Sequence, residues 1–262
     1  MEKVVLDGRN LTLDKIYEVV YNNKIVEIEE EAIKRVAHAR QILFDLAAKG
    51  EPVYGLNRGV GWNKDKEFDR DFFEQYNRNL LYSHSLGVEP YHDDKEVRAI
   101  MLLRLNHALA GSTGISVEIM NLYKEFLNRG IHPRIPRRGS IGEADITTLS
   151  HIGLCFIGEW EVSYKGKVMP SIEALKQENI EPAVLGPKDG LSIVSSNAEG
   201  EAMVYRVIKE TEDLVHMTNL IYCMSLEGLN GVVGSLDEKV NKLRGLKGQI
   251  ECARECRHFL EG

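Results

Sequence analysis

Apolar residues recur every three to four positions along most of the chain, a period that predicts a mainly helical protein. The strongest case is residues 29–49, where acidic residues crowd the start and Gly50 follows the end. The apolar stripe of this segment consists of Ile33, Val36, Ala37, Ile42 and Leu43. The same period predicts helices over residues 13–20, 72–84, 95–110, 117–128 and 146–158, then from 171, over 198–227 and from 248 to 259.

Two stretches refine this helical pattern. Residues 160–169 alternate between apolar and polar positions around Lys165-Gly166, which predicts a small β-hairpin. Residues 198–227 keep helical periodicity without a proline, and helices of this length usually belong to a bundle.

Two glycine-rich segments interrupt the helices. In residues 52–61, Tyr54 is followed by three glycines within seven residues, which excludes a helix and indicates a mobile loop carrying a phenol. In residues 137–151, Gly139 and Gly142 flank Ser140 ahead of an apolar run, so backbone N–H groups at a helix start would point into a tight loop. Alone, the second segment is more often plain helix capping than an active site.

Together the two segments resemble the aromatic amino acid ammonia-lyase family, which includes histidine, phenylalanine and tyrosine ammonia-lyases. Residues 54–61 match the family's tyrosine loop, Tyr-Gly-x-Asn-x-Gly-x-Gly, at every fixed position. Further matches follow in the family's order in residues 5–12, 83–88, 97–106, 111–115 and 133–136. The resemblance implies a mainly α, fumarase/aspartase-like long-helix bundle, with an N-terminal domain that carries the catalytic loops and the small hairpin.

This sequence departs from the family at two places. The family carries Ala-Ser-Gly before the aspartate that opens the helix, and this tripeptide cyclises into an electrophilic methylidene-imidazolone (MIO) group. Here Glu143 and Ala144 precede Asp145, so MIO is not expected unless Ala144 stands for a modified residue. The asparagine that assists MIO is replaced by Ser195, with Asn197 two positions later. One lineage of the superfamily, the ergothionase-like lyases, works without the group.

The resemblance implies elimination of an amine from an α-amino acid to give an α,β-unsaturated acid. Tyr54 is then the predicted base. A free phenol has a pKa of about 10, so a phenolate base needs nearby cations, hydrogen bonds or the substrate's positive charge. The alternative is a structural tyrosine that anchors the glycine loop. Without an electrophile a primary amine leaves poorly, whereas trimethylamine can leave without covalent help, which favours a betaine substrate.

Other residues are candidates for substrate contacts. His84 corresponds to a histidine that faces the substrate ring in histidine-specific members, or it is a helix C-terminal residue that interacts with the dipole. Glu143 either pairs with a quaternary ammonium or is an acidic first-turn residue of the following helix. Gly61, Ser195 and Asn197 complete the predicted substrate-binding set.

Composition limits the other classes of function. The 262 residues are 43% hydrophobic with a formal charge of −7, which argues against a nucleic-acid binder. We see no apolar run long enough for a membrane span and no charged-then-apolar leader, so a cytoplasmic protein is expected. The four cysteines lack a disulfide pattern, and Cys252, Cys256 and His258 are more simply structural than metal ligands, so no metal is expected.

In the family, this sequence ends about midway. We therefore expect residues 1–197 to form the catalytic-loop domain and 198–262 to begin the central helical bundle, with the remainder on a C-terminal-half partner subunit or lost by cleavage or truncation. The resemblance implies a tetramer-like assembly. Two classes of function stay open: a lyase without MIO acting on a betaine such as ergothioneine, with histidine deamination as the alternative, or a non-catalytic lyase-like subunit.

Overall fold

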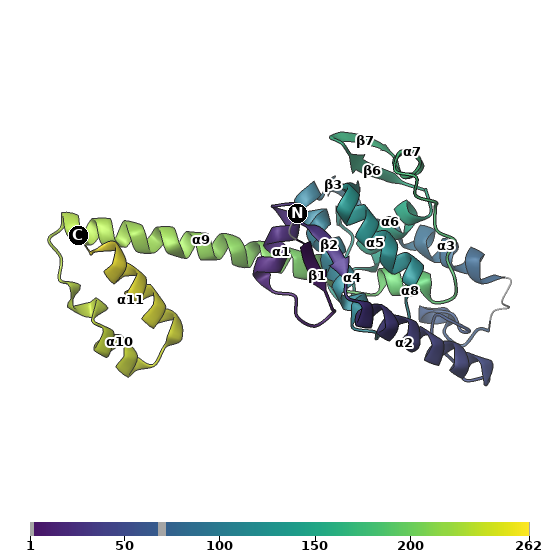
Figure 1. Ribbon diagram of the computed structural model, residues 1–262, viewed down its shortest axis with the longest axis horizontal. Coiled ribbons are helices and arrows are strands. Elements are labelled where there is room, and N and C mark those ends of the chain that lie inside the picture. Colours follow the sequence, from purple (N-terminus) through teal and green to yellow (C-terminus); the bar gives the residue numbers. More distant parts are fainter. Residues whose placement is uncertain (1–2, 68–71, 262) are drawn as a thin grey trace. The chain divides into compact units, whose positions relative to one another are not determined.

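The computed structural model describes residues 3–67 and 72–261 and is mainly helical, as predicted (Figure 1). The chain forms two compact units, Met1–Met203 and Val204–Gly262. The boundary lies within the predicted long helix, α9 (Ala198–Gly228), six residues after the predicted division at 197/198.

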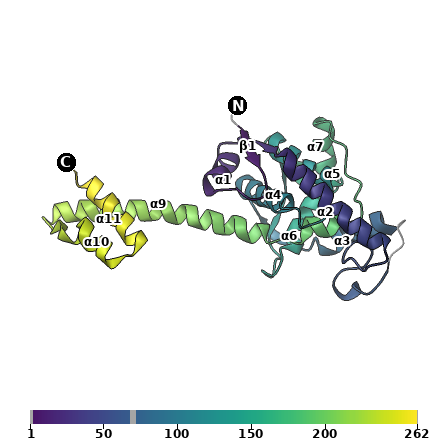
Figure 2. The ribbon, with the colours of Figure 1, turned by 60° about the horizontal axis from the view of Figure 1, so that its bottom comes forward.

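Helix α4 (Asp94–Leu109) lies at the centre of the first unit. It begins with a capping box in which the side chains of Asp93 and Glu96 each accept a backbone N–H. Residues around its whole circumference are buried, because α1 (Leu13–Val20), α2 (Glu30–Ala48) and α5 (Val117–Arg129) all contact it. Figure 2 shows α2 lying across this group of helices.

Two buried arginines on α4 bind the carbonyls at the ends of neighbouring helices. Arg98 donates to Val19 O of α1 at 2.8 Å and to Leu127 O of α5 at 2.8 Å. Arg104, with 0% exposure, donates to Ser192 O and Ile193 O of α8 (Asp189–Val194). Burial lowers the pKa of both guanidinium groups. These carbonyls have no partner within their own helices, so the arginines satisfy groups that would otherwise be buried unpaired.

Within residues 3–67 and 72–261, the strands are short and pair in three small sheets. Parallel β1 (Lys3–Leu6) and β2 (Ile25–Ile28) form one, and antiparallel β3 (Val88–Tyr91) and β5 (Pro136–Arg138) another. The third has the order β4 (Ile131–Pro133), β6 (Glu161–Tyr164), β7 (Lys167–Pro170). The β6–β7 pair is the predicted hairpin. Lys165 and Gly166 at its turn both have positive φ, of 50° and 74°, as a type I′ turn requires.

The remaining helices of the first unit are α3 (Phe73–His84), α6 (Ile146–Phe156) and α7 (Ser171–Gln177), all at predicted places. Helix α6 contacts both α3 and α8. Two details differ from the sequence predictions. Ala37 and Ile42 of α2 are exposed, and Ala32 is buried instead, so the buried stripe of this helix is shifted and narrower than expected. The short helix α8 was not predicted.

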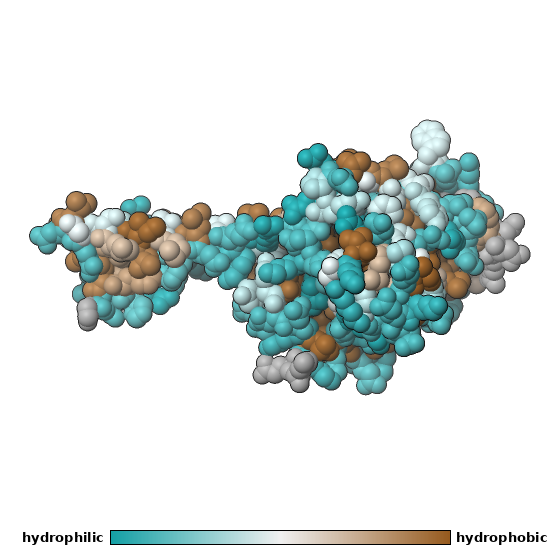
Figure 3. Space-filling model, turned by 90° about the horizontal axis from the view of Figure 1, so that it is seen from above, coloured by the Kyte–Doolittle hydropathy of each residue, from teal (hydrophilic) through white to brown (hydrophobic). Residues whose placement is uncertain are grey.

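The second unit folds around the end of α9. A 3₁₀ turn (Val233–Leu236), α10 (Glu238–Arg244) and the predicted α11 (Lys247–Phe259) return beside it (Figure 1). Its small core contains Cys223, Leu236, Ala253 and Cys256. Many apolar side chains of this unit are exposed, and they gather on the face seen in Figure 3. The large apolar residues of α9 that are exposed are Val204, Val207, Ile208, Leu214, Val215, Met217, Ile221, Tyr222 and Met224.

No helix in the described part of the chain is both long enough and apolar enough to cross a membrane.

Replacing Arg104 with methionine should destabilise the first unit. Arg104→Met keeps much of the side-chain volume but leaves the carbonyls of Ser192 and Ile193 buried without donors. We expect a loss of about 3 kcal/mol in the free energy of unfolding, measured by urea denaturation. The control is Arg129→Met, which removes only half-exposed ion pairs to Glu125 and Glu178 and should cost less than about 1 kcal/mol. Equal losses in the two variants would contradict this account of Arg104.

Candidate active site

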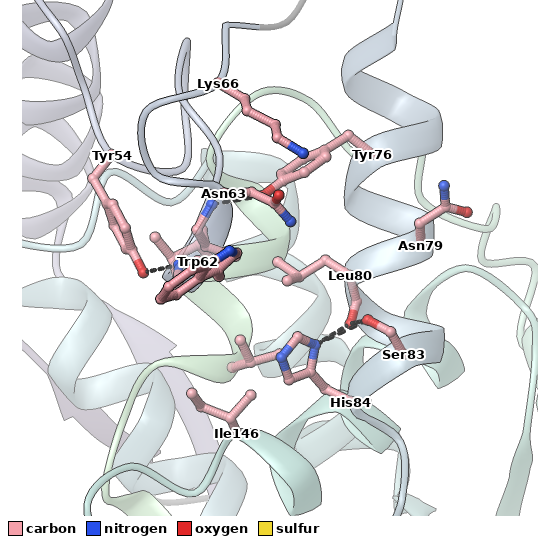
Figure 4. A pocket seen from close by; sticks show the side chains of 14 residues that line it. Tyr54, Trp62, Asn63, Lys66, Tyr76, Asn79, Leu80, Ser83, His84 and Ile146 are labelled. Carbon is pink, nitrogen blue, oxygen red and sulfur yellow. Dashed lines mark hydrogen bonds between the residues drawn. The ribbon is translucent and has the colours of Figure 1, made fainter.

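The two glycine-rich segments meet around a cavity of about 590 Å³ in the first unit. The loop after α2 supplies one wall, α3 a second, and the first residue of α6 together with α8 the third (Figure 4). The lining side chains that bear on the chemistry are Tyr54, Trp62, Lys66, Tyr76 and His84, with Ile146, Leu191 and Val194 as the apolar floor.

The Tyr54 loop is held in shape by its own hydrogen bonds. Asn57 accepts from the backbone N–H of Val53 at 2.7 Å and donates to Glu51 O at 2.8 Å. Gly55 has φ of +70°, which only glycine adopts easily. A Cβ at Gly55 would lie 2.4 Å from a methyl carbon of Leu191, so this glycine also lets the loop approach α8 closely. The asparagine and the glycine of the motif therefore shape the loop.

Tyr54, the predicted base, lies in the wall of the cavity. Its side chain is 47% exposed and lines the cavity, and its hydroxyl oxygen accepts a hydrogen bond of 2.7 Å from the Gly61 N–H. The same N–H can continue to donate to a phenolate oxygen, which is the form that abstracts a proton. Gly61 therefore lines the predicted site, and its N–H contacts the phenol of Tyr54.

His84 ends α3 and turns its ring into the cavity. Its Nδ1 lies 2.8 Å from Leu80 O and 3.1 Å from the Ser83 hydroxyl. A carbonyl only accepts, so Nδ1 is the donor to Leu80 O, and in the neutral imidazole Nε2 is then an acceptor. An Nε2 acceptor can receive the N–H of a substrate ring, and the substrate contact of His84 stays a prediction.

Several lining residues were not predicted from the sequence. Trp62 is 100% exposed at the rim, and Lys66 extends toward Tyr76 in Figure 4. The Tyr76 hydroxyl accepts from Val60 N at 2.9 Å, and burial raises the pKa of this tyrosine. Tyr76 is thus suited to stay a neutral phenol that supports the loop, whereas Tyr54 is the more exposed of the two tyrosines. The apolar periodicity of residues 72–84 predicted a helix with a buried face, but it could not show which loop would lie against that face.

The 139–145 segment has a structural role that the sequence did not reveal. Asp145 is 3% exposed, and its carboxylate accepts from the Ser140 hydroxyl at 2.7 Å. It also accepts from the backbone N–H groups of Glu199 at 2.9 Å and Gly200 at 3.1 Å. Asp145 therefore satisfies donors at the start of α9, while its side chain makes no capping bond to α6.

A buried polar network continues behind this segment. The Glu199 carboxylate accepts from the Thr148 hydroxyl at 2.7 Å and lies 2.9 Å from His92 Nε2. His92 Nδ1 lies 3.0 Å from Glu96, which also pairs with Arg137. The network joins β5, α4, α6 and the first turn of α9, all within the first unit. Buried charges require such pairing, so the start of α9 is fixed to the core behind the cavity.

Three predicted substrate contacts lie outside the lining of this cavity. Glu143, Ser195 and Asn197 are all exposed. Helix α6 begins at Ile146, so Glu143 is not a first-turn residue of that helix, which corrects the capping alternative. The predicted substrate contacts of these three residues stay predictions.

The residues at the family's prosthetic-group position do not fit MIO. Glu143 and Ala144 stand directly before Asp145, so the Ser-Gly pair from which the ring forms is absent at that place. In the described part of the chain, no group of three or more histidine, cysteine, aspartate or glutamate side chains is arranged to hold a metal ion.

Comparisons with known proteins show the family of this chain. The family model described as aromatic amino acid lyase matches residues 11–262. The histidine ammonia-lyase of Geobacillus sp. (strain WCH70) is 37% identical over 261 residues, which cover 99% of this chain and 51% of that protein. The chain spans about half the length of the curated relatives it matches.

Solved structures show the same fold. The ergothionase from Treponema denticola, solved in complex with desmethyl-ergothioneine sulfonic acid, is 65% identical with a TM-score of 0.93, covering 98% of this chain and 52% of that one. The histidine ammonia-lyase from Trypanosoma cruzi is 27% identical with a TM-score of 0.89, covering 98% of this chain and 50% of that one.

Adding a methyl group at Gly55 should displace the Tyr54 loop. Gly55→Ala brings both left-handed strain and a clash with Leu191. Gly50→Ala is the matched control, because Gly50 has φ of +83° and an added Cβ there would have no atom within 4 Å. We expect Gly50→Ala to cost about 1 kcal/mol by thermal unfolding without moving the loop. Gly55→Ala should cost more and shift the NMR resonances of residues 53–61. Unchanged loop resonances in Gly55→Ala would contradict the close approach.

Proposed function

The chain belongs to the aromatic amino acid lyase family, and we propose that it carries the base of a carbon–nitrogen lyase that eliminates trimethylamine from a histidine-like betaine such as ergothioneine, without MIO. The observation that carries this proposal is the replacement of the Ala-Ser-Gly triad by Glu143 and Ala144 ahead of Asp145, beside an intact Tyr54 loop. The 65% identity to the ergothionase from Treponema denticola supports the same substrate class.

The proposed reaction begins at the β-carbon of the substrate. The Tyr54 phenolate takes a β-proton, the electron pair of that C–H bond forms the new carbon–carbon double bond, and the Cα–N bond breaks. The nitrogen leaves with the bonding pair as neutral trimethylamine, and the product is a ring-conjugated acrylate. A quaternary ammonium already carries the positive charge that makes it a leaving group, so no electrophile is needed to activate it.

The cavity suits such a substrate. Its volume of about 590 Å³ lies within the usual range for small-molecule sites. Its floor of Ile146, Leu191 and Val194 is apolar, and His84 Nε2 offers an acceptor for a ring N–H. The aromatic rings of Tyr54, Trp62 and Tyr76 also line it, and such rings attract cations of low hydration. Glu143 is retained as a candidate partner for the quaternary ammonium.

One other function has a specific observation in its favour. Curated relatives at 33–37% identity are histidine ammonia-lyases, which favours histidine deamination. That reaction would require an electrophile that residues 142–145 do not supply. A non-catalytic subunit is disfavoured because Tyr54 keeps its cavity position and its hydrogen bond from Gly61.

We further propose that this chain works with a partner that carries the other half of the lyase fold, in a tetramer-like assembly. The chain spans about half of its relatives, and α9 exposes a series of apolar side chains. Leaving such a face in water is unfavourable, and helices of the proposed partner would cover it.

Tyr54→Phe should abolish turnover while leaving assembly intact, because it removes the base and one hydrogen bond only. The assay is the rise of acrylate absorbance with ergothioneine and, in parallel, with histidine, for the chain together with its partner half. We expect a loss of at least about 10³-fold in kcat with ergothioneine. Full activity in Tyr54→Phe would refute the proposed base, and turnover of histidine alone would refute the betaine proposal.

The partner proposal predicts that Ile221→Glu prevents association. The chain would be co-expressed with the half of the Treponema denticola ergothionase that it does not cover, and the complex measured by light scattering. A charge at Ile221 should break the complex because it must be desolvated in the helix interface. Glu227→Lys, on the same helix at an exposed polar position, is the control and should still assemble. Association of Ile221→Glu with unchanged affinity would count against α9 as the interface.

A further inference from the structure

Lys188 directly precedes α8 in a conformation that few residues other than glycine adopt. Its φ is +76°, in the left-handed region, where a side chain with a Cβ is strained. The residue after it is firmly anchored: the Asp189 carboxylate accepts from the backbone N–H groups of Ser116 and Gly186, both at 2.9 Å, and from Arg40 at 3.0 Å. The strained backbone of Lys188 is therefore fixed to a rigid part of the core.

This backbone directs the side chain toward the Tyr54 loop. The Lys188 ammonium donates a hydrogen bond of 2.6 Å to the backbone carbonyl of Tyr54 and lies 6.0 Å from the centroid of the phenol ring. Its aliphatic stem passes Gly114, where an added Cβ would lie 3.1 Å from Lys188 Cγ. A larger residue at Gly114 would crowd this path. Burial lowers the pKa of Lys188, which reflects how far the ammonium has been drawn from water.

We propose that Lys188 is a positioning residue for Tyr54, which ties the loop to α8 through the Tyr54 carbonyl and places a positive charge beside the phenol. This inference rests on the proposed function of Tyr54 as the base. The positioning role would explain why Lys188 keeps its strained conformation, since strain of this kind persists only where the surroundings enforce it.

The hydrogen bond from Lys188 to the Tyr54 carbonyl, called the tether below, holds the loop to a neighbouring helix. Tyr54 is half exposed, and among the described residues its hydroxyl is held only by the Gly61 N–H, which belongs to the same loop. Bonds within the loop fix its shape but not its position relative to the cavity floor. Lys188 and the contact between Gly55 and Leu191 both join the loop to α8, and α8 supplies floor residues. Small displacements of a base reduce the rate of proton transfer strongly.

The charge of Lys188 adds to the other groups around Tyr54. From its own loop come Lys66 and Arg58, the latter paired with Glu67 at 2.6 Å, and from α3 come Tyr76 and His84. The carboxylate of this set, Glu67, is occupied by Arg58. A cation beside the ring stabilises the phenolate relative to the phenol, so removing Lys188 should move the acidic limb of the activity profile to higher pH.

The first test compares Lys188→Met and Lys188→Arg in the assembled enzyme with ergothioneine. Lys188→Met should lower kcat about ten-fold with KM little changed, and move the acidic limb of the kcat profile up by about half a pH unit. Lys188→Arg retains the donor and the charge and should restore most of kcat and the wild-type profile. Lys176→Met, at an exposed position of α7, is the control. A Lys188→Met enzyme with wild-type kcat and pH profile would overturn the proposal.

The second test needs no activity. Hydrogen exchange of the Gly61 amide, which donates to the Tyr54 hydroxyl, is measured in the chain by NMR. Exchange should be about ten-fold faster or more in Lys188→Met and near wild type in Lys188→Arg, at matched unfolding temperatures. Unchanged protection in Lys188→Met would refute the tether. Lost protection in Lys188→Met, together with a wild-type enzyme that does not turn over ergothioneine, would instead retain the tether and refute the proposed function.

Discussion

The structure depends on buried guanidinium groups that are shielded from water and must find carbonyl partners. Arg104 extends from the central helix α4 to Ser192 O and Ile193 O, and Arg98 extends to the ends of α1 and α5. A charge with 0% exposure is costly unless it is well paired, so these contacts allow little variation in where the helices end. Because Arg104 belongs to the central helix, its hydrogen bonds fix the position of α8 relative to the core.

The position of α8 in turn decides the geometry of the candidate active site. Leu191 and Val194 form part of the cavity floor, Leu191 receives Gly55 at close range, and Lys188 holds the Tyr54 carbonyl. The loop that carries Tyr54, the proposed base, thus lies against a short helix that Arg104 holds to the core. A flexible glycine-rich segment gains a defined position in this way, which general base catalysis requires.

The 139–145 segment has a structural role that its own side chains supply. Asp145 satisfies the first N–H groups of α9, and Glu199 continues the connection to His92. These contacts are structural and do not depend on a prosthetic group. The replacement of Ala-Ser-Gly by Glu143 and Ala144 therefore leaves the connection between this loop and α9 in place.

The sequence by itself determined the longer helices, the 160–169 hairpin, the Tyr54 loop and the family, because periodicity, capping residues and turn glycines act within a few residues along the chain. Only the tertiary structure decided the rest. Strand β2 pairs with β1 on one side, and the side-chain amide of Asn128, about a hundred residues away, hydrogen-bonds to its backbone. The carbonyls at the end of α8 accept hydrogen bonds from the guanidinium of Arg104. Likewise, Asp145 caps α9 instead of the helix it precedes, and Lys188 reaches Tyr54 from a position far along the chain. Partners of this kind are distant in sequence, so no local pattern records them, and their geometry is set by how the helices pack.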